Sequence, residues 1–206
     1  MSEADQVSRR ELLRGLGISA ALATSGAGLV TLEAAQHAHD AVAENKSAAK
    51  GEYTPKCFNA REYQTLRRLS DLIIPADDHS PGALEAGAAE WIDYMASNSP
   101  ELAQIFTGGF GWLDHHMQQL HGADFVDAKP EEQIAVLDVI AFRKDETPEN
   151  AEGVRFFGWA RNLVTDAYYT SPIGVKDLGY MGNTAVSEFH VPDEALQYAL
   201  KRSPFA

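Results

Sequence analysis

Side chains that could bind a metal ion gather in one short stretch of this sequence. Asp114 is followed directly by His115 and His116, and His121 lies five residues further on. Imidazole and carboxylate groups are common ligands of zinc, copper and iron. On a helix, however, His115 and His116 point about 100 degrees apart, and neither has a partner at the i+4 spacing of H-E-x-x-H. The spacing favours solvated histidines, and a stand-alone metal-binding protein or metalloenzyme using His115, His116 and His121 remains the alternative hypothesis.

The other candidates for chemistry are a single thiol and a pair of adjacent acids. Cys57 is the only cysteine, so the chain cannot form an internal disulfide, hold an iron–sulfur cluster or attach haem through two thiols. Asp77 and Asp78 follow Pro75 closely, which is more typical of a turn that caps a helix than of a carboxylate pair. The sequence has no nucleophile elbow, Walker loop or G-x-G-x-x-G. We therefore expect no catalytic residue and no cofactor or metal bound by this chain.

Composition and charge narrow the class of protein further. The chain has 206 residues, of which 45% are hydrophobic, and this suits one well-packed domain. Its 17 Lys and Arg against 30 Asp and Glu give a formal net charge of −13 at pH 7. Such a charge repels phosphate backbones and anionic lipid heads. Nucleic acid is excluded as a partner, and we expect membrane association only through other proteins.

The amino-terminal segment has the layout of an export signal. Arg9 and Arg10 precede a mildly apolar stretch from about residue 16 to 32 that is rich in small residues. This arrangement is typical of a twin-arginine signal, and the stretch is short and weakly hydrophobic for a membrane-spanning helix. We predict a signal at residues 1–35, with an ordinary amphipathic helix as the other interpretation. A clean cleavage site is not evident, and the pathway suits cargo that folds with a cofactor-binding partner before export.

The rest of the chain divides into an alanine-rich segment and a helical domain. Residues 36–52 lack an apolar stripe wide enough to pack, so we expect a linker, either a tether or a solvated helix. The domain covers residues 53–206. Asn59 and Glu62 form a predicted capping box, and Pro75 stops the helix that follows. Pro100, Pro130 and Pro148 introduce further helices.

Helical spacing of the apolar residues gives the expected core. No segment alternates with a period of two, so strands are few or absent. We predict an all-α fold, with one compact helical domain, a long irregular C-terminal arm and a preceding signal segment. The helix that follows Pro100 is expected to face the core with Leu102, Ile105, Phe106, Leu113, Met117 and Leu120. The helix that follows Pro130 is expected to do so with Ile134, Leu137 and Ala141.

The predicted arm, residues 168–183, mixes tyrosines with Gly174, Gly179 and Gly182. Irregular aromatic segments often carry recognition. From composition alone, this one equally suits an arm that packs on the chain's own helices.

Three blocks of sequence together resemble gluconate 2-dehydrogenase subunit 3. This is the small subunit of membrane-associated, flavin-dependent gluconate, fructose, glucose and glucoside dehydrogenases. The blocks are the twin-arginine leader, then LSDLIIPAD at residues 69–77 followed by PGA at 81–83, and finally YYTSPIGVKDLGYMGN at 168–183. The leader departs mildly from the consensus, with Leu12 in place of Phe and Arg14 in place of Lys. The match extends from about Tyr53 to the C-terminal region.

The resemblance implies a non-catalytic small subunit in the periplasm. A large partner resembling glucose–methanol–choline oxidoreductases would carry FAD and oxidise the sugar, and a cytochrome c subunit with haem c, where present, would pass electrons to quinone. The small subunit would support folding and export of a flavin subunit that lacks its own signal. The sugar is not encoded in any motif of this chain. The partner interface expected here comprises Tyr168, Tyr169, Ser171, Tyr180 and Asn183.

Overall fold

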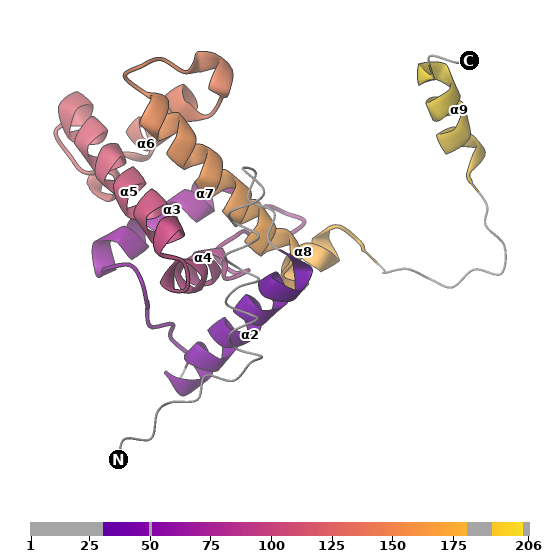
Figure 1. The fold of residues 1–206 in the computed structure, drawn as a ribbon, viewed down its shortest axis with the longest axis horizontal. Helices are drawn as coiled ribbons and strands as arrows, with labels where there is room; N and C mark the ends of the chain where they lie inside the picture. The colour runs from indigo at the N-terminus through magenta and orange to yellow at the C-terminus, as the bar shows by residue number, and fades with distance from the viewer. Residues whose placement is uncertain (1–30, 50, 181–190, 204–206) are drawn as a thin grey trace.

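The computed structural model describes residues 31–49, 51–180 and 191–203 (Figure 1). Arg9, Arg10 and Asn183 lie outside these ranges. The described residues form α-helices and two short 3-10 helices, without a strand, which confirms the predicted all-α fold. The elements are α2 (Leu32–Ala48), α3 (Ala60–Ile73), α4 (Ala88–Ser97), α5 (Pro100–His121), η1 (Phe125–Asp127), α6 (Pro130–Ile140), η2 (Arg143–Asp145), α7 (Ala151–Tyr169), α8 (Pro172–Asp177) and α9 (Asp193–Arg202).

Local sequence explains where the main helices begin and end. The Asn59 side chain accepts hydrogen bonds from the backbone of Arg61 and Glu62, and the Glu62 carboxylate accepts one from Asn59 N, so the predicted capping box is confirmed. Ser99 caps α5 by accepting from Leu102 N. These contacts satisfy backbone N–H groups that have no partner inside the helix. No described helix is long and apolar enough to cross a membrane.

The core is organised around α4, which lies among α2, α3, α5 and α7 (Figure 1). Trp91, Ile92 and Met95 of α4 are completely buried. Beside them a cluster of phenylalanine rings makes edge-to-face and tilted contacts, with ring centroids 5.3 to 5.9 Å apart. Such aromatic pairs add to the stabilisation from area burial alone. The rings belong to Phe58, Phe106, Phe110 and Phe156.

Helix α2 differs from the linker expected for residues 36–52. Ala35 and Ala38 are buried against the body, and the indole N–H of Trp91 donates to Ala35 O at 3.0 Å. Alanine forms no wide apolar stripe, but its short side chain lets two helix backbones approach closely. The expectation that this segment would not pack is therefore wrong for residues 36–48, and α2 begins within the segment assigned to the signal.

Two residues expected to face inward are exposed instead. Leu120 is 58% exposed and Ile134 is 47% exposed. On α6, Gln133 sets the orientation, because its amide donates to Phe125 O at 2.6 Å and its oxygen accepts from Arg68 at 2.7 Å. Turning Gln133 inward turns its neighbour Ile134 outward. Helical spacing predicts which residues share a face, but another element must also cover that face.

Candidate partner interface

Two of the predicted interface residues serve the chain's own fold. Tyr168 is almost fully buried, and its hydroxyl lies 2.5 Å from Ser80 Oγ and donates to Pro81 O at 3.1 Å. Ser171 is also buried, donates to Tyr168 O and accepts from Gly174 N as the N-cap of α8. A partner cannot reach either side chain in this conformation. Their assignment to an interface is therefore incorrect, and both fasten the end of α7 to the body.

The two other tyrosines of the arm remain accessible. Tyr169 is 38% exposed and Tyr180 is 63% exposed, and Leu178 between them is also largely exposed. The start of the arm is helical rather than irregular, because Ser171 and Pro172 open α8 and Gly179, with φ of +61°, follows its end. Tyrosine and leucine side chains at an exposed helix end suit contact with another protein.

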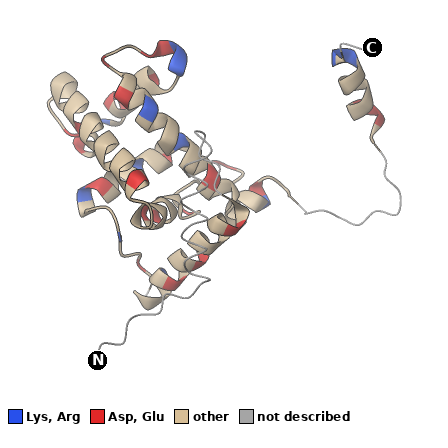
Figure 2. Ribbon diagram, viewed as in Figure 1, with Lys and Arg blue, Asp and Glu red and all other residues tan. Residues whose placement is uncertain are grey.

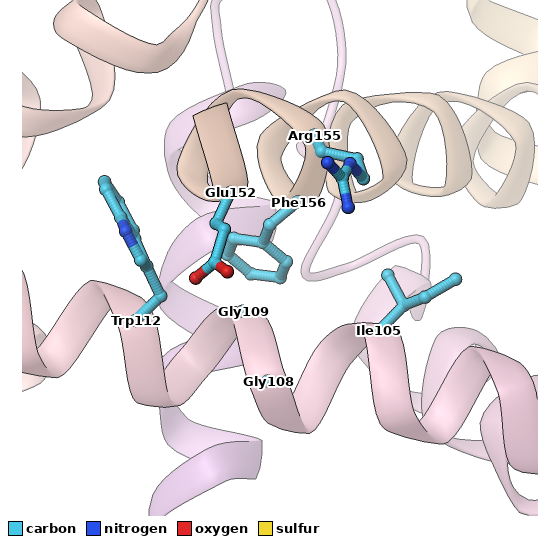
Figure 3. Close-up of a pocket in the computed structure, with 7 residues that line it drawn as sticks. All are labelled: Ile105, Gly108, Gly109, Trp112, Glu152, Arg155 and Phe156. Atoms are coloured by element: carbon cyan, nitrogen blue, oxygen red, sulfur yellow. The ribbon is translucent and has the colours of Figure 1, made fainter. Parts of the chain in front are cut away.

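A second accessible feature is a groove between α5 and α7 (Figure 3). The two helices approach closely because glycines face aromatic rings: a Cβ on Gly109 would collide with Phe156, and a Cβ on Gly153 would collide with Trp112. Trp112 and Ile105 stand at the two ends of the groove, with Phe156 pointing from α7 toward α5 (Figure 3).

The shape and chemistry of this groove suit a protein side chain better than a free metabolite. Its volume is about 230 Å³, below the range of about 300–1,000 Å³ that is usual for small-molecule pockets. The floor is apolar, while Glu152 and Arg155 supply one charge of each sign along the α7 side (Figure 3). An apolar side chain flanked by polar groups would match this lining. The sequence contained a hint of the groove in the adjacent Gly108 and Gly109, which permit a close approach.

The three histidines of the alternative hypothesis lie against different neighbours. His115 contacts the Gln119 amide at 3.0 Å, and the ring of His116 stacks on Trp112 with centroids 4.8 Å apart. His121 Nδ1 lies 3.8 Å from a carboxylate oxygen of Glu132. Among the described residues, no group of three or more His, Cys, Asp and Glu side chains could hold a metal ion. The geometry gives no observation in favour of a metal centre there.

A buried carboxylate that sequence analysis did not single out organises the segment before α3. Asp93 is fully buried and accepts four hydrogen bonds, from the Tyr53 hydroxyl and from the backbone N–H groups of Lys56, Cys57 and Phe58. Burial, with Asp93 nearby, raises the pKa of the Cys57 thiol. A thiol with a raised pKa is a poor nucleophile. Asp93 and Cys57 therefore belong to the scaffold rather than to a reactive site.

One further acid lies on the same face of α7 as Tyr169. Asp166 is partly buried, and burial raises its pKa to about 6. Its Oδ2 has no hydrogen-bond partner among the described residues. A cationic group of another protein would give this oxygen a partner and would favour the ionised carboxylate. Asp166 and Tyr169 are three residues apart and so are neighbours on the helix surface.

Comparison with known proteins decides the family. A sequence model of gluconate 2-dehydrogenase subunit 3 matches residues 60–187, more than half of the chain. The chain belongs to this family. The matched range contains α3 to α8, and so the whole α5–α7 groove and the exposed Tyr169 and Tyr180, while α2 and α9 lie outside it. No curated protein and no solved structure matches the chain. Membership of a subunit family implies association with a dehydrogenase complex and an accessory role in it.

Proposed function

We propose that this chain is the non-catalytic small subunit of a periplasmic, FAD-dependent sugar or polyol dehydrogenase. It supports folding, twin-arginine export and stability of the catalytic subunit, a glucose–methanol–choline-type protein that carries the FAD. A cytochrome c subunit with haem c takes the electrons where it is present. The complex associates with the membrane through these partners. The observation that carries the proposal is the family match over the helical body.

The surface of the body supports such a role. Exposed Tyr169 and Tyr180 at one end, and the apolar groove between α5 and α7, provide places where another protein can bury apolar area. Aromatic residues are enriched at protein interfaces because they bury a large area with little loss of side-chain entropy. The charge of −13 favours a partner whose contacting surface is basic.

Export is tested by producing the tagged chain in a host that also produces the proposed flavin subunit. Periplasmic extract is purified through the tag, and flavin absorbance and dye-linked sugar oxidation are measured in the eluate. We expect both with the native chain, and the loss of both from the periplasm when Arg9 and Arg10 are replaced by Lys. Twin-arginine signals need the arginine guanidinium groups, so the lysine variant keeps the charge while blocking the route.

The cytoplasmic fraction provides the control. If the lysine variant still assembles with the flavin subunit there, the signal and the assembly function are separate, as proposed. A native chain that reaches the periplasm as a monomer, without flavin or activity, would refute the accessory role.

The assembly surface is tested with Tyr169→Ala and Tyr180→Ala together. Because both rings are exposed, the double variant is expected to weaken binding of the flavin subunit while leaving the melting temperature of the isolated chain within a few degrees. Equal loss of thermal stability in the isolated chain would show that these rings serve the fold instead.

A further inference from the structure

Small residues that a signal peptidase could recognise stand at two places near the start of α2. Ser25 and Ala27 form one pair, and Ala34 with Ala35 forms the other. Removal of an export signal takes place beside small side chains of this kind. The first pair lies outside the described residues, whereas the second lies in the first turn of α2. The fold therefore bears directly on a cut at Ala34 or Ala35.

The backbone at Ala34 and Ala35 is helical and covered. Thr31 caps α2, with its hydroxyl accepting from Ala34 N at 3.2 Å and its carbonyl accepting from Ala35 N at 2.9 Å. Ala34 is 9% exposed and Ala35 is 1% exposed. Proteases cut segments that are exposed and free to adopt an extended form in the active site. Hydrolysis at these bonds would require α2 to leave the body and unwind first.

Contacts with two other helices hold this end of α2 on the body. The indole N–H of Trp91, in α4, donates to Ala35 O at 3.0 Å inside the core. His39 Nε2 lies 3.0 Å from Oγ1 of Thr170, at the end of α7. Freeing the first turn of α2 would leave the buried Trp91 N–H without an acceptor, which costs more than an average hydrogen bond contributes. The first turn of α2 therefore opens rarely in the folded chain.

A cut within α2 would also leave an unfavourable charge. Hydrolysis adds water across the peptide bond, so the departing leader gains a carboxylate and the remaining chain gains an ammonium group. After a cut at Ala35 this ammonium would stand at the start of α2, where the helix dipole favours negative charge, and Thr31 and Glu33 would depart with the leader. Figure 2 shows the acidic residues of α2, of which Glu33 is in the first turn. A cut before Thr31 keeps both the cap and this acid.

We propose that the docking of α2 protects Ala34 and Ala35 from the signal peptidase, so that the exported chain keeps α2 and any cut falls before Thr31. This inference rests on twin-arginine export in the proposed function. That pathway carries cargo that is already folded, so α2 is docked when the peptidase meets it. Helix α2 is then part of the mature small subunit, although it precedes the family match over residues 60–187.

The test measures where the chain begins after processing. The native chain, Ala38→Leu and Ala43→Leu are purified from the periplasm, and mass spectrometry of the intact chains gives the first residue. Ala38 is fully buried, so leucine there forces α2 away from the body, whereas Ala43 is exposed and provides the matched control. The same three precursors, purified from the cytoplasm, are incubated with signal peptidase in detergent, and amide hydrogen exchange measures the opening of α2 in each.

We expect the native chain and Ala43→Leu to keep every residue of α2 in both experiments. Ala38→Leu should be cut at Ala34 or Ala35 about tenfold faster, because proteolysis follows the population of the open form. A native chain that begins at Ala35 or Gln36 would overturn the protection, as would an Ala38→Leu chain that opens α2 without being cut there. A native chain absent from the periplasm would overturn the proposed export, while the reaction with the purified precursors would still decide whether α2 protects these bonds.

Discussion

Helix α2 precedes the helical body in the sequence and α9 follows it, and the two differ in how far their apolar side chains are buried. α2 is rich in alanine and has no broad apolar stripe, yet Ala35 and Ala38 are buried against α4. α9 has a clear apolar face with Leu196 and Leu200, yet all of its residues are exposed. Amphipathicity therefore measures how much a helix could gain by docking. Whether it docks within the chain depends on a surface that fits it.

The fit at α2 combines close approach with specific polar contacts. Trp91 donates its indole N–H to Ala35 O, and His39 Nε2 lies 3.0 Å from Thr170 Oγ1 at the end of α7. Small side chains allow these groups to meet. The same principle operates between α5 and α7, where glycines face rings. Packing in this body depends on small residues at helix crossings, and variants at those positions test the comparison directly.

The largest effect is expected at the crossing of α5 and α7. Gly109→Ala places a Cβ against the Phe156 ring and should lower the free energy of unfolding by about 3 kcal/mol. Gly108→Ala is the control on the same helix, because a Cβ there meets nothing within 4 Å. It should raise stability by about 0.5–1 kcal/mol, since alanine is the better helix former. Chemical denaturation measures both, and a stabilising Gly109→Ala would contradict the close crossing.

Next in size is the docking of α2. Ala38→Leu should destabilise the chain by about 1–3 kcal/mol, because Ala38 is fully buried and inserting three more carbons into a packed helix contact forces its neighbours apart. Ala43→Leu on the exposed side of α2 is the matched control and should change stability by less than about 0.5 kcal/mol. Thermal unfolding of the two variants distinguishes them. Equal, small effects would mean that α2 is a solvated helix, as its composition suggested.

A smaller effect on the stability of α2 is expected when the pH of the solution is lowered. Burial lowers the pKa of His39 below 6.5, and the nearby Asp40 only partly opposes this. The folded state therefore binds fewer protons than the unfolded state as the pH falls below 6.5. The stabilisation present above that pH is lost as the pH drops toward the lowered pKa. Amide hydrogen exchange, corrected for intrinsic rates, should show that α2 loses protection as the pH falls through this range. His39→Gln should remove this pH dependence. Protection of α2 that stays the same in the native chain would refute the role of His39.

The smallest effect is expected at α9 in the isolated chain. Leu196→Ala with Leu200→Ala should shift the free energy of unfolding by less than about 0.5 kcal/mol, because neither side chain is buried. The same pair of changes in a core helix would cost several times more. Chemical denaturation of the isolated chain measures this change in the free energy of unfolding. A large loss of stability would show that α9 packs within its own chain and would remove the contrast with α2.

Sequence reasoning was most successful where the decisive contacts are local. The predicted capping box at Asn59 and the predicted helix starts at Pro100 and Pro130 are confirmed, whereas the helix expected from Pro148 begins at Ala151. The family was also recognised, because its blocks are runs of sequence. Prediction of the interface was poorer. Tyr168 and Ser171 were expected to meet a partner, but a tyrosine suited to an interface equally suits a buried hydrogen bond, here to Ser80 and Pro81.

The sequence by itself determined the starts of α3, α5 and α6 and the family, because each depends on residues within a few positions of one another or on ordered sequence blocks. Tertiary structure decided which faces are covered. It buried the alanines of α2, turned Ile134 outward by fixing Gln133, and gave each of His115, His116 and His121 a separate neighbour. The physical reason is that burial is a property of two surfaces that meet. Helical periodicity describes only one of them, and the second comes from residues distant in the chain.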